Sequence, residues 1–229
     1  MIHPLRLFCR VLRDTAATAM TEFALAAPLL MTAGLWGVES ANQAIVQMRV
    51  NQIAVLIADN AARVGENSLL GEAKVYESDI NDVLYGAHVQ GGENFGFYEN
   101  GRVILSSLEV VPDSEDQQYI HWQRCMGKLD HASTYGHAGD GLATPLAGMG
   151  PIGEEIVAFD DEAVMFVEVA YVYQPMIADM FTSARTMTAT AAFNVRENRD
   201  LAEIYQRDET DPDPVAECDR FEGIADYYG

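Results

Sequence analysis

Asp14 to Val38 reads DTAATAMTEFALAAPLLMTAGLWGV. Its uninterrupted apolar run, from Phe23 to Val38, has 16 residues, whereas a membrane-spanning helix needs about 20. Small apolar residues before Glu22 extend the run toward Thr15, provided that the helix tolerates the carboxylate. We therefore expect one membrane-spanning helix from Thr15 to Val38, which would tether the rest of the chain to a membrane.

Basic residues before the span set its expected orientation. Arg6, Arg10 and Arg13 are opposed only by Asp14, so the N-terminus stays cytoplasmic and the C-terminal part is exported. A cleaved signal peptide is the rival interpretation, because the leader is basic and the apolar core is short. The small residues between Ser40 and Ala44 make only a weak cleavage site. We therefore expect a retained, single-pass helix in the inner (cytoplasmic) membrane.

The net charge of −21 lies beyond residue 39, because three basic and three acidic side chains cancel before it. Phosphate binding relies on clustered Lys and Arg, so we expect no nucleic acid partner. Anionic lipid headgroups also repel an acidic domain, and we interpret the charge as a means of solubility. We divide the chain into a cytoplasmic leader (1–14), a transmembrane helix (15–39), an exported α+β domain (40–199) and an acidic C-terminal tail (200–229).

The three cysteines fall on two sides of the expected membrane. Cys9 lies in the cytoplasmic leader, where thiols stay reduced, whereas Cys125 and Cys218 lie in the exported part, where a pair can oxidise. A disulfide between the exported pair closes a loop of about 94 residues, worth about 4–5 kcal/mol in the chain-entropy model. The alternative is two separate small buried side chains. We favour the disulfide, since only one pair is available.

The helical pattern continues past the expected membrane. No proline or glycine interrupts Ser40 to Val64, and apolar residues return to one broad face: Ala44, Ile45, Met48, Ile53, Leu56, Ile57 and Ala61. We expect one long helix whose second half is amphipathic, with Gly65 and Asn67 as its stop. A second, short helix is expected from Ser78 to Gly86, with Ser78 and Asp79 as capping residues.

After Gly91 the pattern changes to strands. Asn94–Tyr98 and Arg102–Val111 flank an Asn-Gly pair, which predicts a hairpin with a type I′ turn. Further strands are expected at Gln118–Arg124, Ala163–Tyr173 and Arg185–Arg196, with a long glycine-rich loop at 127–153 and a polar tail that wraps the surface. The fold class is therefore α+β, with a long N-terminal helix packed on an antiparallel sheet. This is the architecture of type IV pilin-like proteins.

Thr21–Leu30, TEFALAAPLL, resembles the Glu-Phe-Ala-Leu-x-x-Pro-x-Leu signature of the TadE-like family, the minor pseudopilins of the Tad (Flp pilus) assembly system. A looser similarity covers Phe166–Pro175. The resemblance implies a membrane-anchored pseudopilin-like subunit that acts in assembly or anchoring of a Tad/Flp-type pilus or related secretion apparatus. Its implied partners are other pilins and pseudopilins, Tad inner-membrane assembly proteins and the lipid bilayer.

The same resemblance implies cleavage by a prepilin peptidase. The cut between Ala17 and Thr18 would make Glu22 the fifth residue of the mature chain. The family usually has glycine before the cut, and Ala17 departs from that pattern.

Glu22, Phe23 and Pro28 form the expected assembly motif. A carboxylate inside a spanning helix costs about 2.5–3.5 kcal/mol, so some partner should offset the cost. The resemblance implies the free amino terminus of a neighbouring subunit, and the alternative is an interfacial position beside Arg13. Pro28 removes one helical hydrogen bond and can kink the span.

The sequence contains no motif that indicates catalytic activity. His131 and His137, with Asp130 and Asp140, lack the compact spacing of a metal site. The acidic tail residues lack the EF-hand pattern for calcium: Asp208, Glu209, Asp211, Asp213, Glu217 and Asp219. No Gly-x-Ser-x-Gly elbow and no phosphate loop is present. We expect no enzyme activity, no metal and no cofactor.

Two other functions remain open from the sequence. A membrane-anchored binding module, such as an adhesin or sensor, would keep an unprocessed leader and stay a monomer. A secreted hydrolase would lose everything up to about residue 40. Aromatic residues of the expected strands are candidate contact points, although alternating aromatics on a strand more often form the core: Tyr119, Trp122, Tyr171 and Tyr173.

Overall fold

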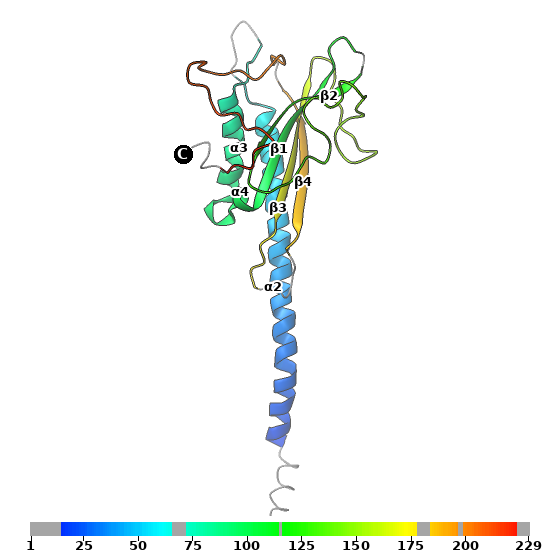
Figure 1. The fold of residues 1–229 in the computed structure, drawn as a ribbon. Coiled ribbons are helices and arrows are strands. Elements are labelled where there is room, and N and C mark those ends of the chain that lie inside the picture. Colours follow the sequence, from blue (N-terminus) through cyan, green and yellow to red (C-terminus); the bar gives the residue numbers. More distant parts are fainter. Residues whose placement is uncertain (1–14, 66–71, 115, 178–183, 197–198, 224–229) are drawn as a thin grey trace, which may run out of the picture. The chain divides into compact units, whose positions relative to one another are not determined.

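A computed structural model describes residues 15–65, 72–114, 116–177, 184–196 and 199–223 (Figure 1). The leader with its arginines and Cys9 therefore lies outside the described residues, as does the expected stop residue Asn67. The chain forms two compact units. The first unit holds α2 up to Ala44 together with residues 175–177, and the second unit holds the other described residues from Ile45 onward.

The long helix is confirmed. α2 spans Thr15–Ala61, 47 residues, with Pro28 inside it. It ends three residues before the expected Val64, and Val64 N–H still donates to Asn60 O at 2.9 Å in the turn that follows. Gly65 adopts φ 143°, which fits its expected role as part of the stop.

Among the described residues, three further helical segments follow α2, and the first corresponds to the short helix expected from the sequence. α3 spans Glu77–Gly91 and is longer than the expected Ser78–Gly86. Its first turn is held by Asp79, whose carboxylate accepts the backbone N–H of Tyr76 at 3.1 Å. Gly92, at φ 76°, follows its end.

The expected hairpin at Asn94–Tyr98 is wrong. A 3₁₀ helix, η1 (Glu93–Phe95), and one helical turn, α4 (Phe97–Asn100), occupy this segment. Gly96 between them has φ 54°, a left-handed conformation that glycine adopts without strain. Phe95, Phe97 and Tyr98 are all buried, so the segment turns all three aromatic rings toward the core, which a strand's alternation would not allow.

The four-stranded sheet has the order β2-β1-β3-β4 and is antiparallel throughout. The strands are β1 (Gly101–Val110), β2 (Gln118–Met126), β3 (Ala163–Val172) and β4 (Thr186–Asn194). These bounds confirm four of the strands expected from the sequence. Both central strands, β1 and β3, are buried along almost their whole length.

The sheet of the second unit is covered on both faces. On one face, Val50, Ile53 and Ile57 of α2 and Ile80 and Leu84 of α3 pack on odd-numbered strand residues in the main hydrophobic core: Val103, Leu105, Val167, Val169 and Met187. On the other face, Met149 and Ala158 from the segment after β2 pack on a smaller cluster: Leu108, Ile120, Val164 and Phe166. The long loop expected at 127–153 thus covers the outer face of the sheet.

The C-terminal tail is part of the fold and does not only wrap the surface. Ala216 is fully buried in the main core. Cys125 N–H donates to Ala216 O at 2.7 Å, and Gly127 N–H donates to Glu222 O at 2.8 Å. The tail therefore covers part of the outer edge of β2.

Candidate functional site

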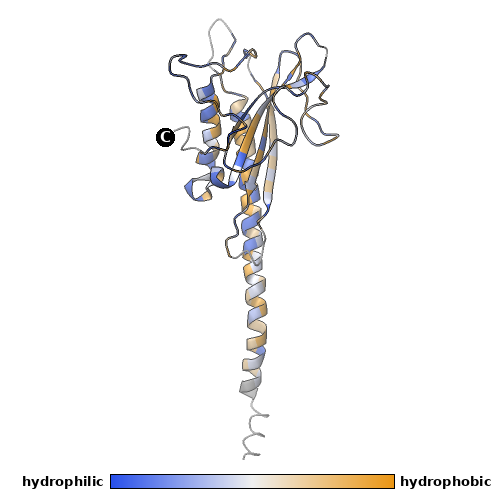
Figure 2. Cartoon of the chain, viewed as in Figure 1, coloured by the Kyte–Doolittle hydropathy of each residue, from blue (hydrophilic) through white to orange (hydrophobic). Residues whose placement is uncertain are grey.

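The first part of α2 exposes its large apolar side chains. Those from Met20 to Val38 are between 42% and 74% exposed: Met20, Phe23, Leu25, Leu29, Leu30, Met31, Leu35, Trp36 and Val38. Figure 2 shows the hydrophobic colours along this helix. Soluble proteins rarely leave so much contiguous apolar surface in water. This helix is long and apolar enough to cross a membrane, which is compatible with a single-pass anchor.

Hydroxyl groups within this helix are satisfied by the helix itself. Thr21 Oγ1 donates to Thr18 O at 2.8 Å, and Thr32 Oγ1 donates to Pro28 O at 2.7 Å. Ser40 Oγ donates in the same way to Trp36 O at 2.9 Å. In lipid, where water cannot solvate a hydroxyl, this bonding removes the cost of burying one.

The expected motif residues lie along this exposed surface. Glu22 is exposed, Phe23 is 70% exposed, and Pro28 lies inside the continuous helix. Within the described part of the chain, Glu22 has no ion-pair partner, and its alternative partner Arg13 lies outside that part. A carboxylate on an apolar helix surface can form an ion pair with a cationic group of another molecule. Ala17 and Thr18, the expected cleavage residues, lie near the start of α2.

A second carboxylate on α2, Glu39, is fully buried. It accepts the backbone N–H groups of Met176 at 3.2 Å and Ile177 at 3.1 Å. The helix thereby holds the segment that follows β3 within the first unit. The sequence did not reveal this role, because the partners are backbone groups more than 130 residues away in the chain.

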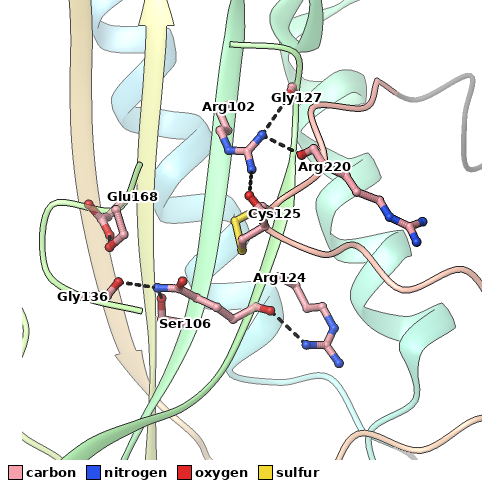
Figure 3. Close-up of a disulfide and its surroundings, with 11 residues drawn as sticks. Arg102, Ser106, Arg124, Cys125, Gly127, Gly136, Glu168 and Arg220 are labelled. Carbon is pink, nitrogen blue, oxygen red and sulfur yellow. Dashed lines mark hydrogen bonds between the residues drawn. A yellow bond between two sulfur atoms is a disulfide. The ribbon is translucent and has the colours of Figure 1, made fainter. Parts of the chain in front are cut away.

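Cys125 and Cys218 form the disulfide expected from the sequence, with an S–S distance of 2.04 Å. Beside it, Arg102 of β1 is 1% exposed (Figure 3). Its guanidinium donates to Cys218 O at 2.6 Å, and to Gly127 O and Arg220 O at 3.0 Å each. It also lies 4.4 Å from the centre of the Phe221 ring. One buried cation and one covalent bond thus attach the tail to the sheet.

The tail is also attached to α3. Asn81 Nδ2 donates to Pro214 O at 2.8 Å, and Glu77 N–H donates to Tyr205 O at 2.9 Å. Glu77 is itself buried, and its carboxylate accepts one hydrogen bond from Arg124 Nε of β2, 2.9 Å from Oε2, and another from Arg124 Nη2 at Oε1. A planar guanidinium suits such a paired contact with a carboxylate. These contacts make the tail a structural element of the second unit.

A polar cavity of about 480 Å³ lies at the end of β1. Its wall includes Glu109, Tyr119 and three consecutive acids of the loop before β3: Asp160, Asp161 and Glu162. Glu109 is buried and accepts a hydrogen bond from Ser107 Oγ at 2.6 Å, while His121 Nδ1 lies 3.0 Å from Glu109 Oε2. The hydrogen bond to Glu109 raises the pKa of His121 above 6.5. Burial, with Glu109 nearby, raises the pKa of Tyr119 to about 12.

The aromatic residues and His137 noted in the sequence analysis contribute to packing or to local hydrogen bonds. Tyr119, Tyr171 and Tyr173 are buried and Trp122 packs against the core, so these aromatics belong to the core and are not exposed contact points. His137 N–H donates to Asp140 Oδ2 at 2.9 Å within the loop that covers the sheet. Among the described residues, no group of three or more His, Cys, Asp or Glu side chains is arranged to hold a metal ion.

Comparisons of the chain with protein family models, with curated proteins and with solved structures found no match.

Proposed function

We propose that the protein is a membrane-anchored, pilin-like subunit that acts in assembly or anchoring of a Tad/Flp-type pilus or a related secretion apparatus. The observation that carries the proposal is the exposed apolar surface of α2, which bears the Glu-Phe-Ala-Leu motif and a single carboxylate, Glu22. The helix anchors the chain in the inner membrane, and the second unit is exported. No catalytic chemistry is part of this role.

In this proposal, Glu22 selects the neighbour of the helix. The cost of placing a carboxylate in lipid is offset when Glu22 meets the amino terminus that cleavage before Thr18 creates on another pilin or pseudopilin. Phe23 and the other exposed side chains pack against that neighbour's helix. The acidic second unit stays in solution and contacts the remaining assembly proteins.

Substitution of Glu22 in the native cell tests the proposal. Glu22→Ala should leave the protein in the membrane fraction at its normal level, because an apolar residue favours insertion. It should also abolish surface pili or the secretion that depends on them. The matched control is Glu93→Ala, an exposed glutamate of η1 in the second unit, which should have no effect. Normal assembly with Glu22→Ala would refute the role given to this carboxylate.

Crosslinking through the membrane helix separates the proposal from the adhesin or sensor alternative. Both predict a membrane protein, but only an assembly subunit can be crosslinked through the helix to a pilin. A cysteine in place of Leu25, which is 74% exposed, is the crosslinking position. If the Leu25→Cys protein forms no crosslink to a pilin in cells whose pili assemble normally, the result would favour the binding module.

A further inference from the structure

The two edges of the sheet differ in whether other segments of the chain cover their outward backbone groups. On the outer edge of β2, Ile120 N–H donates to Asp140 O at 2.8 Å, and Gly139 N–H donates to Ile120 O at 2.7 Å. The tail covers the same edge at Cys125 and Gly127. β4, at the other edge of the sheet, pairs on one side with β3 and has no strand on its other side among the described residues.

β4 also lacks the features that protect natural edge strands. Its sequence, TMTATAAFN, contains no charge and no proline, and its pairing with β3 runs without a register shift. Charged side chains, proline and bulges are the usual ways to prevent another strand from adding to an edge. An uncharged, regular strand of nine residues is therefore a template for strand addition.

The register shows which backbone groups are available. Val195 N–H donates to Ala163 O at 2.9 Å and Tyr173 N–H donates to Arg185 O at 3.0 Å, so the odd-numbered residues of β4 bond toward β3. The backbone groups of Thr186, Thr188, Thr190, Ala192 and Asn194 consequently point away from the sheet. Gln47 of α2 donates to Thr188 O at 3.2 Å, and the described residues supply no partner to the outward groups from Thr190 to Asn194.

An apolar groove lies beside this edge. It has a volume of about 580 Å³ and lies on the outward face of α2, with Phe193 of β4 and Gln90 of α3 in its wall. Val55 and Leu56 form its apolar floor, and Val55 is 49% exposed. A strand that adds to β4 would direct every second side chain toward the helix side of the sheet, where this groove lies.

We infer that the edge of β4 and the groove of Val55, Leu56 and Phe193 bind an extended segment of a different protein by strand addition. The segment is free of acidic residues and has apolar side chains at alternate positions. Backbone hydrogen bonds supply affinity and the groove supplies specificity, as in other peptide sites formed by a strand and a helix. A second copy of this chain is disfavoured, because each copy carries a net charge of −21. The inference does not depend on the proposed pilus role.

A library of random peptides displayed on phage tests this inference. It is selected on the full-length chain in detergent micelles, and the enriched peptide is measured by fluorescence anisotropy. We expect enriched peptides to have apolar residues at alternate positions and few acids. N-methylation of the alternate amides that face β4 should weaken binding by about tenfold or more, because it removes the backbone donors.

Two substitutions locate the site on the protein. Thr190→Pro removes an outward N–H and leaves the bonds to β3 intact, a position where edge strands accept proline. Val55→Gln makes the groove polar without altering a buried side chain. Each should weaken binding by about tenfold. The matched control, Val89→Gln on α3, changes a side chain that is 66% exposed and outside the groove, and should bind like the wild type.

Several results would overturn the inference. They are no enriched peptide, binding that survives both substitutions, and equal binding of the N-methylated peptide. A full-length chain that dimerises without peptide and becomes monomeric with Thr190→Pro would assign the edge to a second copy instead. None of these results affects the membrane test of Glu22, because neither substitution lies in the first unit.

Discussion

Arg102 donates a hydrogen bond to the carbonyl oxygen of Cys218, the residue whose side chain is disulfide-bonded to Cys125. The tail is therefore attached twice at one residue, once through its backbone and once through its side chain. The two attachments differ in kind, because the disulfide restricts the unfolded chain whereas the buried cation acts only in the folded state.

Removal of the disulfide should destabilise the second unit. Cys125→Ser should lower the free energy of unfolding by up to about 4–5 kcal/mol, the loop entropy that the crosslink removes from the unfolded chain. Thermal unfolding of the full chain in detergent measures the effect. Cys9→Ser is the matched control, because Cys9 is not part of this bond. An unchanged unfolding temperature in the Cys125 variant would show that the crosslink is absent or without effect.

Substitution of Arg102 should destabilise the fold even when the disulfide is intact. Arg102→Met keeps an apolar stem but leaves three carbonyl oxygens without this donor, at a cost of about 1–3 kcal/mol for each buried group left unpaired. Arg63→Met serves as the control, because the Arg63 side chain is 55% exposed. Proteolysis should cut the tail of the Arg102 variant first, and equal protease resistance of both variants would contradict the role of Arg102.

The pair of His121 and Glu109 should make stability depend on pH. Because folding raises the pKa of His121, the pair stabilises the fold below the unfolded pKa of about 6.5, and this contribution is lost as the pH rises through the folded pKa. Asp160, Asp161 and Glu162 line the same cavity as Glu109. The stability difference between wild type and His121→Gln should therefore be largest below about pH 6.5 and decrease over the pH range above that value. A difference that is constant over this range would contradict the assignment.

Glu39 should hold the segment after β3 in place. Loss of its carboxylate in Glu39→Ala leaves the N–H groups of Met176 and Ile177 without this acceptor. Amide hydrogen exchange at these two residues should become about tenfold faster or more, since hydrogen bonds to a charged group are worth about 1.5–3 kcal/mol. Exchange in β1 should stay unchanged. The same exchange rates in variant and wild type would rule out this contact.

The sequence predicted those elements whose side chains repeat with a clear period. Apolar residues recur along α2 at helical spacing, and runs of β-branched and aromatic residues mark β1 and β3, so these elements are confirmed. The prediction of a hairpin strand before β1 was wrong, because an Asn-Gly pair also occurs at the end of a helical turn such as α4. Phe95 and Phe97 are two residues apart and mimic a strand, yet both rings pack on Tyr171 in the core.

The candidate site was predicted only where it is local in sequence. The motif around Glu22 is a continuous stretch, and the two cysteines that follow the apolar helix in the sequence allow only one pair. Arg102, Glu109 and Glu39 were not identified, because their roles depend on partners brought close by the fold, such as Cys218, His121 and Ile177. The only signal in the sequence was a charged residue within an expected strand, as for Arg102 and Glu109, or directly after the apolar run, as for Glu39.

The mass of the N-terminal peptide of the protein, extracted from its native membrane, tests the central claim most directly. The proposed pilin-like role predicts a peptide that begins at Thr18, which keeps the apolar helix and gives a neighbouring Glu22 an amine to bind. A peptide that begins at Met1 would contradict this assembly mechanism. A chain that begins after residue 39 would contradict the membrane anchor as well.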